Sequence, residues 1–206
     1  MKRRTFVLAT LAFGATGAAY ANDDGLYADV FDPNSSFIRV IAPGQTFATI
    51  GAKTLRDLEE GMSPYVNVMP GDIPVSLGSL ETSVTAAPGA YYTVVISDGA
   101  ATVLEDEVTG SPAKSDVTVY NLAGAETVEL YVPAAKATAI DAVAPLTGAS
   151  VALKAPLTLD FELRSGGDTL ASVAQVELKR KAGVSIILTQ AGDTYRAFAA
   201  PNVYTQ

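Results

Sequence analysis

The sequence predicts an all-β protein, with two tandem antiparallel β-sandwich domains of the immunoglobulin-like or jelly-roll-like type after a cleaved signal peptide. Three observations support this fold class. Short runs of alternating apolar and polar residues recur along the 206-residue chain, turn residues end these runs, and only one segment has the composition of a helix. A chain of this length suffices for two small domains, each with its own core.

The alternating runs are the expected strands. Residues 157–163 place four apolar side chains on one face and Thr, Asp and Glu on the other. The same period of two occurs at 65–68, 117–119, 128–132 and 184–186. Residues 134–143 are rich in alanine, which favours a helix, but they also contain β-branched residues, which favour extended chain. We interpret that segment as strand or loop.

Turn residues between the runs predict hairpins. Asp98-Gly99 separates the apolar runs 92–97 and 100–104, and this dipeptide suits the positive φ angles of a type I′ turn. Residues 165–168 and 191–193 contain glycine and aspartate and are expected to separate two further pairs of strands.

The N-terminus has the features of an export signal. Residues 2–4 are basic, residues 6–19 are modestly apolar, and Ala19-Tyr20-Ala21 is a small-x-small cleavage signature. We therefore expect residues 1–21 to be removed and the mature chain to be periplasmic. Arg3-Arg4 fits a twin-arginine signal as well as an ordinary secretory signal, so the export route stays open.

A short, turn-rich segment divides the mature chain. Residues 109–114 lack apolar periodicity and predict a boundary between an N-terminal acidic domain, 22–111, and a C-terminal domain, 112–206. The segment 36–40 in the first half and 115–119 in the second are similar and lie 79 residues apart. Each half also ends in an expected hairpin. The simplest explanation is a duplicated β-sandwich.

Charge separates the two halves. Removal of the signal leaves 11 basic and 22 acidic residues, a net charge of −11, which argues against a nucleic-acid partner. Residues 22–111 hold 13 acidic and three basic residues, whereas residues 112–206 hold nine and eight. A polyanion is therefore repelled by the first domain, and a basic protein surface is attracted to it.

Missing residue types exclude several chemistries. The chain has no His and no Cys, so it cannot form Ser-His-Asp or Cys-His catalytic groups, Cys/His zinc sites or iron–sulfur clusters. No G-x-S-x-G motif is present, and a Ser nucleophile would need a Lys base. We predict no catalytic residue, no cofactor and no metal ligand.

Two acidic groups remain to be considered. They are Asp57, Glu59 and Glu60, and the consecutive Glu105, Asp106 and Glu107. Neither has a calcium-loop spacing, and neighbouring residues of a strand point to opposite faces, so we interpret both groups as solvated turn or edge charges. Two carboxylates from different strands at glycosidase separation stay an open alternative.

Aromatic and basic residues offer a binding hypothesis. Tyr91 and Tyr92 are adjacent, so one ring is expected to face the core and the other to lie outward, where it could stack on a sugar. Arg39 lies within an apolar run and is interpreted as a paired structural arginine or as a guard on an edge strand. The candidate polysaccharide contact is Lys179, Arg180 and Lys181, and a strand end or hairpin tip is the alternative interpretation.

A family resemblance extends over nearly the whole mature chain. The segments that carry it are 25–27 (GLY), 36–40 (SFIRV), 68–71 (VMPG), 91–95 (YYTVV), 117–122 (VTVYNL), 143–146 (VAPL), 157–164, 165–168 (SGGD) and 176–180 (VELKR). In this order they resemble the AlgF family of periplasmic alginate O-acetylation accessory proteins.

The resemblance implies two β-domains in a periplasmic machine that acetylates an exported polysaccharide. In that system a membrane acyltransferase passes acetyl groups outward, SGNH-type enzymes transfer them to sugar hydroxyls, and the AlgF-like protein is an adaptor. We therefore expect a non-catalytic adaptor for a periplasmic SGNH-type O-acetyltransferase, with the membrane acyltransferase and the polysaccharide as further candidate partners. The alternative is a carbohydrate-binding module for an anionic exopolysaccharide.

Overall fold

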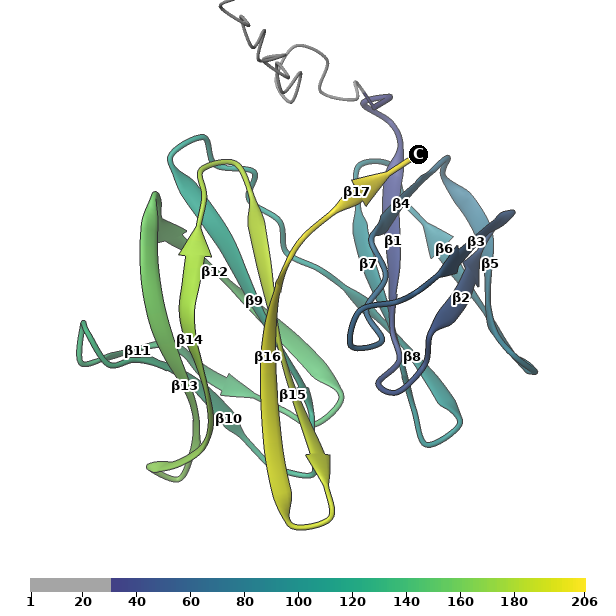
Figure 1. Cartoon of the computed structure of the whole chain (residues 1–206). Helices are drawn as coiled ribbons and strands as arrows, with labels where there is room; N and C mark the ends of the chain where they lie inside the picture. The colour runs from purple at the N-terminus through teal and green to yellow at the C-terminus, as the bar shows by residue number, and fades with distance from the viewer. Residues whose placement is uncertain (1–30) are drawn as a thin grey trace, which may run out of the picture. The chain divides into compact units, whose positions relative to one another are not determined.

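The computed structural model describes residues 31–206, so the expected signal peptide and the segment 25–27 lie outside the described residues. The described part contains seventeen strands in four sheets and no helix, as the sequence predicts (Figure 1). No helix of residues 31–206 is therefore long and apolar enough to cross a membrane.

The first sandwich consists of one five-stranded and one four-stranded sheet. Their orders are β17-β4-β1-β7-β8 and β3-β2-β5-β6. The core between them is apolar and includes Ile38, Val66, Val75 and Val94. The strands are β1 (Ser36–Ile41), β2 (Phe47–Ile50), β3 (Lys53–Arg56), β4 (Tyr65–Val68), β5 (Gly71–Leu77), β6 (Leu80–Ala86), β7 (Tyr91–Ser97), β8 (Ala100–Glu105) and β17 (Tyr204–Thr205).

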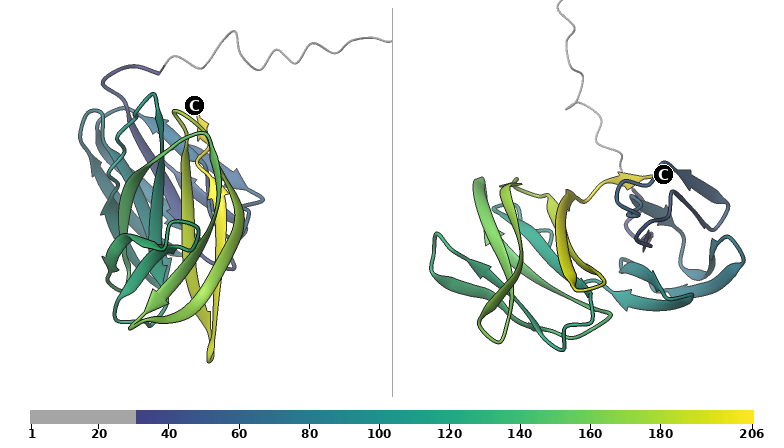
Figure 2. Two further views of the ribbon diagram at one scale, coloured as in Figure 1. Left: turned by 90° about the vertical axis from the view of Figure 1, so that its left-hand side faces the viewer. Right: turned by 60° about the horizontal axis from the view of Figure 1, so that its bottom comes forward.

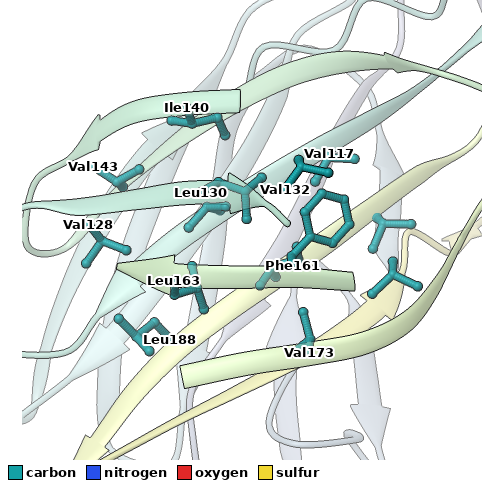
Figure 3. Close-up of a cluster of buried hydrophobic side chains, with 14 of the residues drawn as sticks. Val117, Val128, Leu130, Val132, Ile140, Val143, Phe161, Leu163, Val173 and Leu188 are labelled. Atoms are coloured by element: carbon teal, nitrogen blue, oxygen red, sulfur yellow. The ribbon is translucent and has the colours of Figure 1, made fainter. Parts of the chain in front are cut away.

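The second sandwich consists of two four-stranded sheets. Their orders are β12-β9-β15-β16 and β11-β10-β13-β14. Its core contains Leu130, Phe161, Leu163 and Leu188, which lie between the strands in Figure 3. The strands are β9 (Lys114–Leu122), β10 (Val128–Val132), β11 (Ala137–Val143), β12 (Thr147–Lys154), β13 (Leu157–Ser165), β14 (Asp168–Leu178), β15 (Gly183–Ala191) and β16 (Thr194–Pro201).

The two sandwiches have the same topology, which confirms the predicted duplication. Adding eight to each strand number converts the orders β4-β1-β7-β8 and β3-β2-β5-β6 into those of the second sandwich. The two similar segments, 36–40 and 115–119, lie in the equivalent strands β1 and β9. Each of these strands pairs in parallel with the first strand of the last hairpin, β7 or β15. Each sandwich thus contains a parallel pair in an otherwise largely antiparallel architecture.

The predicted turns are present. Asp98 and Gly99 join β7 to β8 with φ angles of 51° and 74°, as a type I′ turn requires. Gly166-Gly167 joins β13 to β14, and Gly192-Asp193 joins β15 to β16. The segment 134–143 is a turn followed by β11, so extended chain prevails over its alanine content.

The last strand returns to the first sandwich. After β16 the chain leaves the second sandwich, and β17 pairs in parallel with β4 through Tyr204 and Tyr65 (Figures 1 and 2). The sequence segment 112–206 therefore supplies one strand to the first sandwich. We keep 22–111 and 112–206 as our proposal for the limits of the two domains, with this strand as the exception.

Strands at the centre of the molecule are buried on both faces. All six residues of β1 are buried: Ile38 and Val40 face the first core, and Ile41 joins Tyr120 and Ile187 in a separate apolar cluster. β9 and β15 are likewise buried along most of their length. The sheet that contains β1 and the sheet that contains β9 and β15 therefore share a buried layer of side chains. We call this layer, which is separate from the two cores, the junction.

Candidate functional site

Arg39 occupies the centre of the junction. Its side chain is 1% exposed and donates hydrogen bonds from Nε to Thr93 Oγ1 at 2.9 Å and from Nη2 to the Tyr120 hydroxyl at 2.7 Å. Nη1 donates to Asn202 Oδ1 at 3.0 Å. Since Thr93 belongs to β7 and Tyr120 to β9, Arg39 connects the two sandwiches. Its interpretation as a paired structural arginine is confirmed, but β1 lies between β4 and β7 and is not an edge strand.

Asp106 lies on the other side of the same hydroxyl groups. Its Oδ2 accepts hydrogen bonds from the Tyr65 hydroxyl at 2.8 Å and from Thr93 Oγ1 at 2.6 Å, and its Oδ1 accepts one from the Tyr120 hydroxyl. The carboxylate and the guanidinium are thus connected through Thr93 and Tyr120. We name these five residues, with Asn202, the junction network.

The interpretation of the acidic run 105–107 as solvated charge is therefore wrong for its middle residue. Glu105 and Glu107 are exposed, but Asp106 is half-buried and turns toward the junction. Its neighbours on the chain point outward because successive side chains of an extended segment alternate in direction. The burial of Asp106 depends on Tyr120 from the second sandwich, which one-dimensional spacing does not reveal.

The environment fixes the charge states of the junction network. Burial raises the pKa of the Tyr120 hydroxyl to about 12, and it also raises the pKa of Tyr65. Burial alone would lower the pKa of Arg39, but the oxygens of Tyr120, Tyr65 and Asp106 outweigh it and raise that pKa. At neutral pH both phenols are therefore protonated donors and Arg39 is a cation, which suits a permanent structural connection.

An aromatic cluster extends the junction toward the chain end. Tyr91 stacks on Phe37 with ring centroids 4.8 Å apart, and Tyr204 of β17 stacks on Tyr65 at 5.4 Å. Phe37 also meets Tyr204 edge to face at 5.5 Å. Tyr92 is buried in the first core. Tyr92 thus faces the core as expected, and Phe37 covers one face of the half-buried Tyr91 ring.

The candidate polysaccharide residues lie together at one turn. Lys179, Arg180 and Lys181 connect β14 to β15 and are all exposed. Lys179 Nζ lies 3.4 Å from a carboxylate oxygen of Glu177, and Arg180 Nε donates to the Ala155 carbonyl at 3.1 Å. Lys179 also borders a depression of about 250 Å³ between β14 and β16. The turn thus has an exposed basic surface beside a shallow hollow, with Lys179 and Arg180 already in polar contacts within the chain.

Residues 31–206 contain little that resembles a catalytic site. No group of three or more Asp or Glu side chains in this range could hold a metal ion. The spacing Ser111-x-x-Lys114 matches the serine–lysine motif of some acyl enzymes, a match that the sequence analysis missed. In the structure, residues 111–114 form a turn that leads into β9. The Lys114 amide donates a hydrogen bond to the Ser111 carbonyl at 3.4 Å.

These features define an all-β protein of two duplicated sandwiches whose buried polar residues join one sandwich to the other. The family model described as "Alginate O-acetyl transferase AlgF" matches residues 9–185. A protein of Pseudomonas fluorescens, "Alginate biosynthesis protein AlgF", is 28% identical over 195 residues, which cover 93% of this chain and 89% of that protein. The chain therefore belongs to the AlgF family, whose name refers to alginate O-acetylation.

Two solved structures are also similar. The C-terminal domain of AlgF from P. aeruginosa covers 43% of this chain and 98% of its own length, with 21% identity and a TM-score of 0.39. A "putative cell adhesion protein" from Bacteroides ovatus covers 86% of this chain and 99% of its own length, with 8% identity and a TM-score of 0.31.

Proposed function

We propose that this chain is a non-catalytic periplasmic adaptor for the O-acetylation of an exported polysaccharide, alginate by family membership. It binds a periplasmic SGNH-type O-acetyltransferase, with the membrane acyltransferase as a second candidate partner. The observation that carries the proposal is the junction network. Arg39 of the first sandwich and Asp106 both bond to the Tyr120 hydroxyl of the second, so these polar side chains join the two sandwiches.

Charge supports a protein partner over a polyuronate. The first domain has 13 acidic and three basic residues, so it repels an anionic polymer and attracts a basic protein surface. The absence of His and Cys from the sequence removes the commonest acyl-transfer groups. An adaptor requires neither.

The non-catalytic role is tested with the purified chain 22–206. We expect it to release no acetate from an acetyl ester and to transfer no acetyl group to an oligouronate when it is alone. Added to the SGNH-type enzyme, it should raise the acetylation of the same acceptor. Acetyl transfer by the chain alone would contradict the proposal. The Ser111→Ala and Lys114→Met variants would then test whether these two residues carry that activity.

The basic turn favours a second candidate function, the binding of an anionic polysaccharide. Its support is the exposed group Lys179, Arg180 and Lys181 beside the hollow between β14 and β16. Reversal of all three charges to Glu should then abolish retention on an acidic-polysaccharide column, whereas Lys136→Glu, a change at an exposed lysine elsewhere in the second sandwich, should not. Retention that is unaffected by reversal of the three charges would remove this candidate.

A further inference from the structure

An apolar depression lies where the chain crosses from β16 to β17. It has a volume of about 200 Å³ and is walled by Leu58, Met62, Pro64, Ala200, Pro201 and Val203. We call it the Met62 depression. Val203 is 55% exposed, which is high for a large apolar side chain. The depression therefore combines the loop after β3 with the segment that returns from the second sandwich.

The loop that forms one wall is held in a fixed conformation. Asp57 and Glu60 have positive φ angles of 56° and 50°, which residues other than glycine rarely adopt. The Leu58 amide donates to the Thr46 carbonyl at 3.1 Å, and the Ala42 amide donates to the Gly61 carbonyl at 2.9 Å. Such strain persists only where the surrounding structure enforces it, so the depression is preformed.

The floor of the depression is coupled to the junction network. Arg39 Nη1 lies 3.6 Å from the Met62 sulfur, in hydrogen-bonding geometry, and the same nitrogen donates to Asn202, the residue before Val203. Met62 on one side of the depression and the segment of Asn202 and Val203 on the other thus both depend on contacts with the buried Arg39 guanidinium. A ligand in this depression therefore contacts surfaces that exist only while the two sandwiches are joined.

Size and charge indicate what the depression accepts. About 200 Å³ is below the usual range of small-molecule sites, roughly 300–1,000 Å³, but it suits one inserted side chain. Asp57 and Glu59 border it, and Glu60 follows in the same loop. Within residues 31–206 these three carboxylates form no ion pair, and Arg56 is the only cation among the lining residues. An apolar side chain flanked by basic residues is complementary to this arrangement.

We propose that the Met62 depression is the docking point for a basic segment of a protein partner, which inserts one aliphatic or aromatic side chain between Met62 and Val203. The inference rests on the adaptor function proposed above and states the chemistry of the partner's contact. A polyuronate does not meet these requirements, because it is anionic and the border of the depression is acidic. An apolar anchor with a charged border is also the usual composition of a protein interface.

The test uses the chain 22–206 and the purified SGNH-type O-acetyltransferase of the same host, immobilised on a sensor at low and high salt. Val203→Glu should weaken binding by about tenfold or more, because it places a charge beside the inserted side chain. Val203→Ser should weaken it in the same direction with less disturbance of the fold. Joint Asp57→Asn and Glu59→Gln changes should weaken binding at low salt and reduce its dependence on salt.

Matched controls separate docking from general damage. Met69→Glu changes an apolar side chain that is 59% exposed on the same sandwich, and Glu81→Gln removes an exposed carboxylate from β6. Neither should alter the affinity. All variants should show the thermal midpoint of the unmodified chain, which establishes that any lost affinity is local.

The outcomes distinguish this inference from the function on which it rests. If the unmodified chain binds the acetyltransferase and both Val203 variants bind equally well, the docking point is wrong and the adaptor function stands. Tighter binding after the Asp57 and Glu59 changes would show an acidic partner segment and overturn the stated chemistry. If the unmodified chain does not bind the enzyme, the adaptor proposal fails and the docking inference fails with it.

Discussion

Arg39 of the first sandwich donates a hydrogen bond from Nη2 to the hydroxyl oxygen of Tyr120 in the second, at 2.7 Å. The two residues are 81 positions apart in the sequence and lie in β1 and β9, the equivalent strands of the duplicated fold. Tyr120 then donates to Asp106, so one phenol connects a buried cation to a carboxylate. The adaptor proposal depends on this connection, because it makes two small domains into one scaffold.

Removal of the guanidinium should destabilise the protein strongly. Arg39→Leu removes the hydrogen bonds that the buried guanidinium donates to Thr93, Tyr120 and Asn202, and loss of one member of a buried charge network costs about 3 kcal/mol or more. The free energy of unfolding in denaturant measures this. Arg56→Leu, a change at an exposed arginine, should leave the midpoint unchanged. Equal midpoints for the two variants would contradict the structural role of Arg39.

Alkaline pH should weaken the junction. Burial raises the pKa values of Tyr120 and Tyr204 from 10.0 to about 12, so the folded state favours the protonated phenols. Their contribution is fully present below pH 10.0, the unfolded value, and is lost as pH rises toward about 12. Across this range the unfolding midpoint of the Tyr120→Phe variant should fall less steeply with pH than that of the unmodified chain. An identical slope would show that Tyr120 does not titrate as described.

The neutral-pH effect of the same variant is a separate prediction. Tyr120→Phe removes one donor to Asp106 and one acceptor for Arg39 while the ring stays in place. Unsatisfied polar groups in a buried site cost about 1–3 kcal/mol, so the midpoint should fall clearly. Tyr195→Phe, on β16 outside the junction network, is the control and should cause little change. An unchanged midpoint for Tyr120→Phe would indicate that water replaces the hydroxyl.

The ring of Tyr204 should stabilise the return of the chain end. It contacts Tyr65, Phe37 and Tyr91, and no hydrogen bond of its hydroxyl occurs within residues 31–206. Tyr204→Ala should therefore cost about 2 kcal/mol through lost aromatic contacts, whereas Tyr204→Phe should be nearly neutral. Thermal unfolding of both variants checks this. Similar losses in the two would assign the stabilisation to the hydroxyl instead.

Gly61 should tolerate no side chain. A Cβ at this position would lie 2.1 Å from the Ala42 carbonyl oxygen, and the φ angle is +77°. Gly78 has a φ angle of +61° but open space around it, so Gly78→Ala should cost only about 1 kcal/mol of backbone strain. Gly61→Ala should cost considerably more and should deform the wall of the Met62 depression. Equal losses would show that the loop at Gly61 moves freely.

Local sequence signals predicted much of the fold. Alternation identified strands such as β10, in which every second side chain is buried, and Asp98-Gly99 identified a hairpin because few dipeptides adopt two positive φ angles. The duplication was visible in the similar segments within β1 and β9. Arg39 within an apolar run left two interpretations, a paired structural arginine and a guard on an edge strand, and only the first is confirmed.

Contacts between segments far apart in the chain could not be predicted from the sequence. β17 has only two residues, and its pairing with β4 depends on a position 139 residues earlier. Asp106 was interpreted as solvated with its neighbours Glu105 and Glu107, because its partners Tyr65, Thr93 and Tyr120 come from three other strands. The Met62 depression is likewise formed by residues from the ranges 56–64 and 200–203, whose proximity no local pattern encodes.

The adaptor function requires that the chain bind the acetylation enzymes. The most direct measurement is to isolate the N-terminally tagged mature chain from periplasmic and membrane extracts of its own host and to identify retained proteins by mass spectrometry. We expect recovery of an SGNH-type O-acetyltransferase in stoichiometric amount, and less of it with Arg39→Leu. Isolation of the chain without any acetyltransferase, together with its retention on an acidic-polysaccharide column, would contradict the adaptor function.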